Sequence, residues 1–309
     1  MRGRLPICDI KRTYPVKNKT ANQYFMERFS CKVYRIALDA GFTCPNRDGK
    51  IDTRGCIFCS GCGSGEFSGN RDLGITEQIE RGKELVRNKM PKEGGRFIAY
   101  FQAFSGTYAP VGRLKSLYEE AAYHPDVVAV AIATRPDCLP DEVLDLLTEI
   151  NRIKPVWIEL GLQTIHEKTA EYIRRGYPLR VYDDAVRALT QREIEVVAHI
   201  ILGLPFETRE DMLKTAEYVG SQPISGIKIH LLHVLKGTDL AAEYARGVFR
   251  CLSMEEYTDL VRDCIKLLPD DIVIHRMTGD GARRDLIAPM WSTDKKRVLN
   301  MLNEKLANI

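Results

Sequence analysis

Short runs of apolar, mostly β-branched residues alternate along this chain with longer stretches in which apolar residues recur at helical spacing. Six of the runs predict buried strands, and they begin at Val33, Phe97, Val127, Val156, Val196 and Gly226. The stretches between them predict amphipathic helices, for example over residues 75–90 and 139–154. Most strand starts are about 30 to 40 residues apart, the length of one βα unit. Near-continuous apolar strands are typical of a parallel sheet that is covered on both faces, so the pattern predicts an α/β fold.

The segments that follow the six predicted strands indicate how the sheet closes. They are polar, and most contain glycine or proline: TCPN, SGTYAP, TRPD, QTIHEKT, LPFET and KGTD. In a βα barrel the carboxyl ends of the strands form one rim, where the chemistry takes place. A doubly wound sheet instead concentrates such segments at one switch point. The pattern therefore favours a barrel, complete or incomplete, and the chain has neither a G-x-G-x-x-G after the first strand nor a Walker loop to support a nucleotide-binding alternative.

Composition and charge limit the class of protein further. The chain has 309 residues, 44% of them hydrophobic and 28% charged, which is ordinary for a soluble protein with a core. Its start has no apolar core region, and the run over residues 127–133 is too short to span a bilayer, so we expect a cytoplasmic protein without membrane contact. Residues 1–35 carry nine basic and two acidic side chains, and residues 275–309 carry seven and four. Such basic ends are either simply solvated or hold a polyanion.

Cysteines are concentrated in the polar, glycine-rich segment after the first predicted strand. Four of the nine lie between Cys44 and Cys62. In a cytosolic protein this indicates metal, redox or catalytic use before disulfides, with plain burial as the other explanation. The run Cys56-x-x-Cys59-x-x-Cys62 is crowded for a structural zinc site and natural for an iron–sulfur cluster, on which three thiolates leave one iron open. A zinc-bound barrel that binds nucleic acid or serves as a scaffold is the alternative class.

Several motifs together resemble the radical S-adenosylmethionine (SAM) superfamily. They are DAGFTCPNRDGKIDTRGCIFC, YFQAFSGTYAP, TRPDCL, ELGLQT and HLLHVLKGTDL. The long gap between Cys44 and Cys56 departs from the commonest spacing of the superfamily and is similar to the branch related to the catalytic subunit of elongator, and within it to the YhcC/YtqA-type family. The resemblance implies a partial (β/α)6 parallel barrel, which we expect over residues 33–250. A basic N-terminal extension, residues 1–32, would precede it, and a C-terminal extension, residues 251–309, would pack on it.

The resemblance also implies the cofactors and their ligands. Cys44, Cys56 and Cys59 match the ligands of a [4Fe–4S] cluster, whose open iron is chelated by the amine and carboxylate of SAM. One electron from the cluster then cleaves SAM to a 5′-deoxyadenosyl radical, which abstracts hydrogen from the substrate. Cys62 has no counterpart among these ligands, and a triad of Cys56, Cys59 and Cys62 is the alternative.

Further residues match positions that bind SAM. An aromatic residue, Phe58, matches one that lies beside the adenine, and the segment QAFSGT matches the one that holds the methionyl amine, although it lacks the usual Gly-Gly-Glu. Glu159, in a buried strand, is expected to meet the ribose hydroxyls, or else a structural salt bridge. Arg175 either reaches the SAM carboxylate or is a solvated helix-end residue. The full set of expected SAM contacts is Phe58, Gln102, Ser105, Gly106, Thr107, Glu159, Gln163, Arg175, Gly203 and Pro205.

Basic side chains on the sixth predicted strand indicate where a substrate binds. Alternation places Lys228, His230 and Lys236 on one face and His233 on the other. If the first face points into the barrel, it offers hydrogen-bond donors to an anionic substrate; the other explanation for either histidine is a satisfied core residue. The glycine-rich C-terminal segment adds His275 and Arg276. These six residues are the expected catalytic or substrate-binding set.

The substrate itself is implied by the resemblance alone. The elongator-like branch acts on the wobble uridine of tRNA, and the YhcC/YtqA-type family is linked to trimming a carboxymethylaminomethyl group on that base toward the aminomethyl form, which a methyltransferase then completes. The expected partners are therefore tRNA, an electron donor such as flavodoxin or ferredoxin, and a downstream methyltransferase. The alternatives are another RNA, a peptide or a small molecule.

Overall fold

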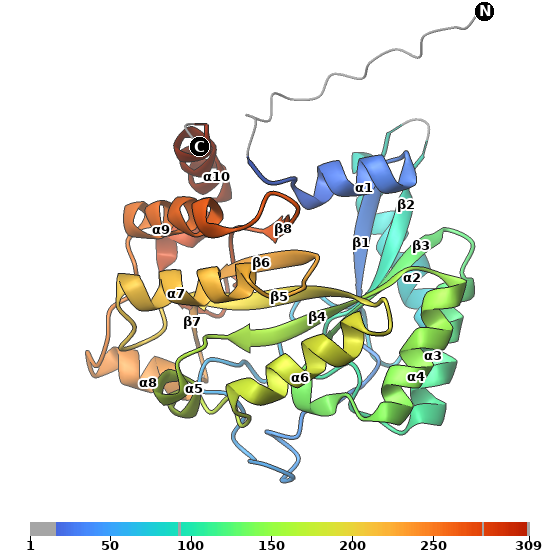
Figure 1. The fold of residues 1–309 in the computed structure, drawn as a ribbon, viewed down its shortest axis with the longest axis horizontal. Helices are drawn as coiled ribbons and strands as arrows, with labels where there is room; N and C mark the ends of the chain where they lie inside the picture. Colours follow the sequence, from blue (N-terminus) through green and yellow to red (C-terminus); the bar gives the residue numbers. More distant parts are fainter. Residues whose placement is uncertain (1–16, 92–93, 280, 308–309) are drawn as a thin grey trace, which may run out of the picture.

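The structure is a computed structural model that describes residues 17–91, 94–279 and 281–307. Its centre is a curled sheet of seven parallel strands in the order β1-β2-β3-β4-β5-β6-β8 (Figure 1). A separate antiparallel pair is formed by β7 and β9. The strands are β1 (Val33–Leu38), β2 (Arg96–Phe101), β3 (Val127–Thr134), β4 (Val156–Gln163), β5 (Glu195–Leu202), β6 (Gly226–Leu231), β7 (Val234–Leu235), β8 (Val273–Arg276) and β9 (Leu286–Ala288).

Helices cover the convex, outer face of the curled sheet. Helices α2, α3, α4, α6 and α7 pack directly on the strands, α9 packs on α7, and α10 packs on α9 (Figure 1). The helices are α1 (Ala21–Phe29), α2 (Ile75–Val86), α3 (Val111–Tyr123), α4 (Asp141–Ile153), α5 (Glu167–Tyr172), α6 (Leu179–Thr190), α7 (Arg209–Gly220), α8 (Asp239–Ala245), α9 (Met254–Leu267) and α10 (Lys295–Leu306), with 3-10 turns at Arg87–Lys89, Pro136–Cys138 and Met290–Thr293.

The main hydrophobic core lies between the outer face of the sheet and these helices. Alternate residues of each strand point into it, because successive side chains of a strand face opposite sides of the sheet. On β4, for example, Ile158 and Leu160 are fully buried in this core, together with Leu147 of α4. The intervening residues of every strand therefore face the inside of the barrel, and their identity decides what the interior can do.

The inner face is apolar at the amino ends of the strands. Ile98, Trp157 and Val197 form a second buried cluster there with Phe25 of α1. The ring of Phe25 is stacked on the indole of Trp157, with 5.5 Å between the centroids. Helix α1 and these side chains, which we call the apolar plug, thus close the barrel at the amino ends of its strands. A ligand has room on the other side of the plug, toward the carboxyl ends of the strands.

Helix α1 also connects the two edge strands of the open sheet. It contacts both β1 and β8, and Thr20, which begins the helix with a capping box, forms a parallel bridge with Ile274. Above it, Nη2 of Arg35 on β1 donates a hydrogen bond to Nδ1 of His275 on β8, at 2.5 Å. The edge strands β1 and β8 are therefore joined by side chains near the amino ends of the barrel strands. The two strands are not paired with each other in the described residues.

The six predicted strands and the parallel α/β partial barrel are confirmed, with a seventh strand added. That strand, β8, lies within the expected C-terminal extension, and its four residues are too few to stand out as an apolar run. Of the expected basic N-terminal extension, residues 1–16 lie outside the described residues, and the remainder contains α1. Among the described helices, none combines the length and the apolar character that crossing a membrane requires.

Candidate active site

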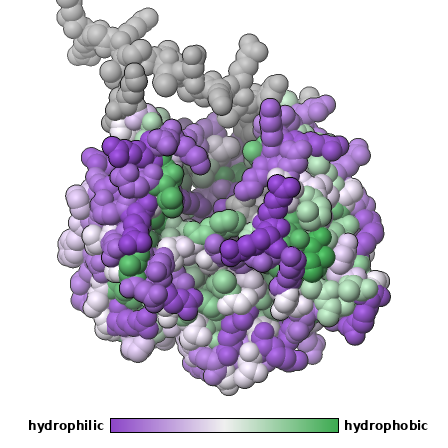
Figure 2. Space-filling model, turned by 180° about the vertical axis from the view of Figure 1, so that it is seen from behind, coloured by the Kyte–Doolittle hydropathy of each residue, from purple (hydrophilic) through white to green (hydrophobic). Residues whose placement is uncertain are grey.

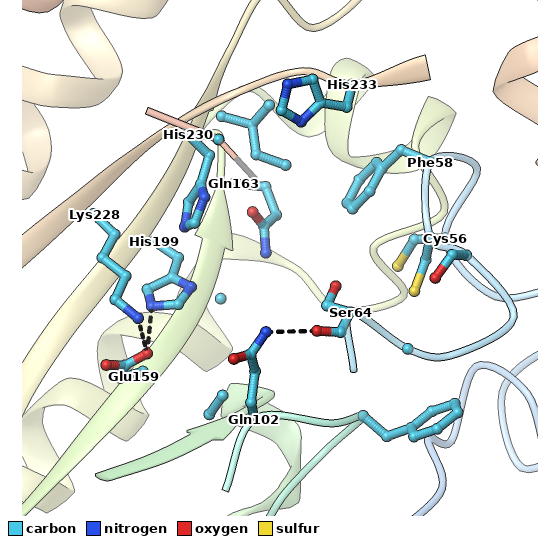
Figure 3. A pocket seen from close by; sticks show the side chains of 18 of the residues that line it. Cys56, Phe58, Ser64, Gln102, Glu159, Gln163, His199, Lys228, His230 and His233 are labelled. Carbon is cyan, nitrogen blue, oxygen red and sulfur yellow. Dashed lines mark hydrogen bonds and ion pairs between the residues drawn. The ribbon is translucent and has the colours of Figure 1, made fainter. Parts of the chain in front are cut away.

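A cavity of about 490 Å³ opens at the carboxyl ends of the barrel strands. Its size is typical of a site for a small molecule or cofactor. Figure 3 shows that Cys56 and Phe58 lie at one end of it and that Glu159, His199 and Lys228 lie at the other. The face of the molecule opposite to that in Figure 1 is hollowed between largely hydrophilic ridges (Figure 2).

The cysteine-containing loop after β1 is tied down over this cavity by backbone-directed hydrogen bonds. The buried side chain of Asn46 donates to the carbonyl oxygen of Arg174 at 2.7 Å. The guanidinium of Arg47 donates to the carbonyl oxygens of Cys59 and Ser60, at 2.8 and 2.6 Å. Gly55 adopts a φ of 78°, and a β-carbon there would come within 2.9 Å of Arg47, so only glycine fits this turn without displacing the arginine.

Three cysteines of the loop face the cavity and the fourth does not. Cys44, Cys56 and Cys59 belong to the cavity lining, whereas Cys62 is exposed. Burial raises the pKa of the Cys56 thiol, and burial together with the nearby Cys56 raises that of Cys59 to about 12. Such thiols ionise when they bind a metal, because a coordinating cation reverses the local electrostatics. Three sulfur donors from one loop over one cavity fit the ligand set that the sequence predicts for a [4Fe–4S] cluster.

Six of the ten residues expected to contact SAM line the same cavity. They are Phe58, Gln102, Ser105, Glu159, Gln163 and Arg175. Gln102 donates from Nε2 to the carbonyl oxygen of Ser64 at 2.6 Å, which joins β2 to the cysteine loop (Figure 3). Gln163 ends β4 with a φ of 68°, an unusual conformation for a residue with a side chain.

The other four expected SAM contacts have structural surroundings. The amide of Gly106 donates to the carbonyl oxygen of Ala133 at 2.8 Å, and a β-carbon at Gly106 would lie 2.9 Å from that oxygen. The hydroxyl of Thr107 is buried against Thr134. Gly203 has a φ of 88° and packs near Leu252, and Pro205 is buried two residues later. Direct contact of these four with SAM stays a prediction.

Arg175 is almost fully buried rather than solvated. Its Nε donates to the carbonyl oxygen of Tyr177 at 3.0 Å, and its Nη1 donates to those of Leu162 and Thr164 at 3.1 and 2.6 Å. Its remaining nitrogen lies 3.3 Å from Glu167. This side chain therefore holds the end of β4 against the following loop, and a contact with the SAM carboxylate stays a prediction.

The end of the cavity opposite the cysteines is a cluster of buried charges on the inner face of the barrel. Glu159 accepts hydrogen bonds from Lys228 and from His199, the latter at 3.1 Å, and lies 3.4 Å from Arg35 of β1. Nζ of Lys228 also donates to the hydroxyl of Tyr100 at 3.2 Å. The carboxylate that the sequence assigns to ribose is thus engaged in the salt bridge that the sequence left open as the other explanation, and ribose contact stays a prediction.

The ionisation of this cluster follows from burial and from its charges. Burial alone would raise the pKa of Glu159, but Lys228 and Arg35 hold it well below its usual value. Burial lowers the pKa of Lys228 to about 7 although Glu159 is adjacent, because Arg35 and Arg276 act in the same direction as burial. Burial and Lys228 lower the pKa of His199 to about 4, and burial holds that of His230 well below its usual value. Both imidazoles are therefore neutral near pH 7.

Four of the six expected substrate-binding residues line the cavity: Lys228, His230, His233 and Arg276. His233 lies beyond the end of β6, so strand alternation does not govern its direction. Lys236 instead donates to the carbonyl oxygen of Arg284 at 2.8 Å. His275 packs edge-on against Phe25 and Trp157, at the apolar plug.

Sequence reasoning did not select three members of the charged cluster: Arg35, Tyr100 and His199. A usable signal exists for Tyr100 and His199, since each is flanked in its strand by buried residues, whereas Arg35 lies next to the half-buried Tyr34. A polar side chain at such a position needs a partner inside the barrel.

Three cysteines that line a cavity of cofactor size in a parallel partial barrel define a class of protein, and comparison with known proteins agrees. Residues 51–219 match the radical SAM superfamily, and residues 224–308 match the radical SAM C-terminal domain. The chain belongs to the radical SAM superfamily. The cofactors predicted from the sequence, a [4Fe–4S] cluster and SAM, are those of this class of enzyme.

Particular relatives place the chain within the superfamily. It is 46% identical over 289 residues to YtqA of Bacillus subtilis, which covers 94% of this chain and 89% of YtqA, and 37% identical over 269 residues to YhcC of Escherichia coli, which covers 87% and 85%. It is 24% identical over 156 residues to the tRNA uridine(34) acetyltransferase of Methanocaldococcus jannaschii, which covers 50% of this chain and 28% of that protein. The predicted resemblance to the YhcC/YtqA-type family is confirmed.

One solved structure shows the same fold. The archaeal Methanocaldococcus infernus Elp3 superposes with a TM-score of 0.66 at 16% identity, over 88% of this chain and 63% of that chain. The structural match therefore extends over most of the described barrel, on a fold that is shared with the elongator-like branch.

Proposed function

We propose that this chain is a radical SAM enzyme that acts on the wobble uridine of tRNA and converts a carboxymethylaminomethyl group toward the aminomethyl form. The observation that carries the reaction class is the cavity with Cys44, Cys56 and Cys59 at one end in a chain of this superfamily. The choice of RNA is supported by a relative that is a tRNA uridine(34) acetyltransferase. It is also supported by the basic excess at both ends of the chain, which suits contacts to phosphates.

In this proposal the three cysteines hold the cluster, and Phe58, Gln102 and Gln163 bound the space for SAM. When bound, the cluster and SAM together supply a carbon-centred radical that removes a hydrogen atom from the substrate. The chain positions these groups and excludes water from them. Asn46 and Arg47 hold the cysteine loop over the cavity, and α1 closes the barrel at the amino ends of its strands. A uridine reaches such a site only when it leaves the base stack, which the unpaired anticodon loop permits.

The proposal includes the partners that the reaction needs. A flavodoxin or ferredoxin would supply the electron, and a methyltransferase would act on the aminomethyl product. Phosphate contacts predict that binding to tRNA weakens steeply as salt is raised.

The test incubates the reduced, cluster-loaded enzyme and SAM with tRNA that carries the carboxymethylaminomethyl uridine, and then digests the tRNA to nucleosides. We expect the aminomethyl nucleoside to appear at the expense of the substrate nucleoside. An unchanged nucleoside profile, in a reaction where SAM cleavage is measured and found, refutes the tRNA substrate. The radical enzyme would then act on another RNA, a peptide or a small molecule.

A further inference from the structure

The charged cluster at the end of the cavity opposite the cysteines contains more cations than carboxylates. We call this cluster the cavity floor; it consists of Arg35, Tyr100, Glu159, His199, Lys228 and His230. Lys228 and Arg35 share the single carboxylate of Glu159, and the histidines are neutral near pH 7. Among the six residues of the floor, the positive charges therefore exceed the carboxylates by one when Lys228 is protonated.

Buried positive charge of this kind is costly unless an anion compensates it. Lys228 is only 2% exposed, and its acceptors among the described residues are Glu159 and the hydroxyl of Tyr100. An ammonium group has three N–H donors, so one remains for a ligand in the cavity that Lys228 lines. Counted over the described residues of the floor, the compensating charge is that of one monoanion.

A second polar group, the imidazole of His230, lies beside the lysine. Nε2 of His230 is buried and makes no hydrogen bond to any residue that the structure describes, although His230 lines the cavity. The centroid of its ring lies 5.0 Å from that of His199. Nε2 of His199 is already hydrogen-bonded to Glu159. An unpaired buried nitrogen is rare in proteins and is explained when a ligand supplies its partner.

We propose that the cavity floor is a subsite for a carboxylate group of the substrate, bound by the ammonium of Lys228 and the imidazole of His230. Glu159 and His199 are positioning residues, because they orient Lys228 and neutralise part of the charge around it. The subsite lies at the end of the cavity away from Cys56 and Phe58, so it is on the substrate side rather than the cluster side (Figure 3). This inference rests on the proposed function, since it assigns one group of that substrate to these residues.

The test compares RNA hairpins that carry the anticodon loop and differ only at the wobble uridine. One has the carboxymethylaminomethyl group, one has its methyl ester, and one is unmodified. Binding is measured by fluorescence anisotropy with the cluster-loaded protein and without reductant, so that no turnover occurs. We expect the wild-type protein to bind the carboxylate hairpin about tenfold more tightly than the ester, as one charge-assisted hydrogen bond provides.

The informative variant is the double substitution Glu159→Gln with Lys228→Met. Lys228→Met alone would leave Glu159 ionised and buried, whereas the double change removes both charges of the pair. We expect it to bind the ester as the wild type does and to lose the preference for the carboxylate. The matched control is Lys115→Met with Glu149→Gln, which removes an exposed ion pair of 2.9 Å between α3 and α4 and should keep the preference.

The outcomes separate this inference from the proposed function. Equal affinity of the wild type for carboxylate and ester, or a preference that survives the double substitution, overturns the subsite while tRNA binding stands. If no hairpin binds, the tRNA proposal is wrong, and the subsite is tested with N-methylglycine alone. It should then raise the melting temperature of the wild type but not of the double variant, and no difference between the two refutes the subsite.

Discussion

At the scale of single residues, the direction in which a side chain points separates chemistry from structure. Cys62 belongs to the same C-x-x-C-x-x-C run as Cys56 and Cys59, yet it is exposed while they line the cavity. Cys44 is distant in sequence and lines the cavity with them. The loop therefore presents one set of three thiols to the cavity, and spacing within the run is a poor guide to which three.

Replacing Cys44, Cys56 or Cys59 singly with alanine should reduce bound iron from about four atoms per chain to nearly none, because each supplies a third of the protein ligands of the cluster. The measurement is iron content and visible absorbance after anaerobic purification. Cys62→Ala is the matched control within the same loop and should keep most of its iron. Loss of iron from Cys62→Ala, with iron retained in Cys44→Ala, would show that the ligand set is wrong.

At the scale of elements, α1 closes one end of the open, curled sheet, at the amino ends of its strands. The helix lies before β1 in the sequence, yet it packs on β8 and on the inner face of β4 at the other side of the barrel. The apolar plug that it forms with Trp157 separates the cavity floor from solvent at the amino ends of the strands. Burial of the floor, and with it the strength of its electrostatic interactions, depends on this contact.

Phe25→Ala should lower the free energy of unfolding by about 3 to 5 kcal/mol, the usual cost of removing a buried aromatic ring from a packed site. The measurement is chemical denaturation followed by circular dichroism. Met26→Ala, on the exposed side of the same helix, should change the stability by less than about 0.5 kcal/mol. If the two variants are equally stable, α1 does not close the barrel as described.

At the scale of the whole molecule, His199 of the cavity floor makes the free energy of unfolding depend on pH. The pKa of His199 is about 4 in the folded protein, against 6.5 for an ordinary histidine, because of burial and the facing Lys228. Arg276 and His230 face it as well, and Glu159 opposes the shift. Between pH 6.5 and 4 the unfolded chain binds a proton here that the folded chain does not, so stability falls as pH falls through this window.

The free energy of unfolding should therefore decrease between pH 7 and pH 5, with a contribution of about 2 kcal/mol from His199. His199→Gln keeps a hydrogen-bond donor for Glu159 but cannot titrate, so its stability should fall less over the same interval. Denaturant titrations of both proteins at several pH values measure the difference. Parallel pH profiles would mean that His199 is not held neutral in the folded state.

The sequence by itself determined the strands, the parallel barrel and the family. Short, near-continuous apolar runs rich in β-branched residues favour strands buried on both faces. The motifs around Cys44, Phe58 and Gln102 occur in an order that resembles the superfamily. These features are local or ordered along the chain, so they are readable without coordinates. The short strand β8 was not predicted, because four residues carry too little periodicity and its strand character depends on pairing with β6.

Only the tertiary structure decided which polar residues meet. Arg35, Tyr100, Glu159, His199 and Lys228 come from five strands that are far apart in sequence. The register of the sheet sets His199 beside Lys228, and side-chain contacts inside the barrel bring Arg35, Tyr100 and Glu159 to them. In the same way, it placed Lys236 on a surface carbonyl and His275 against the apolar plug, although both belong to the basic segments singled out in the sequence. Residue type and spacing limit what a side chain is able to do, but its partner is chosen by contacts across the sheet, and a single sequence does not encode those contacts locally.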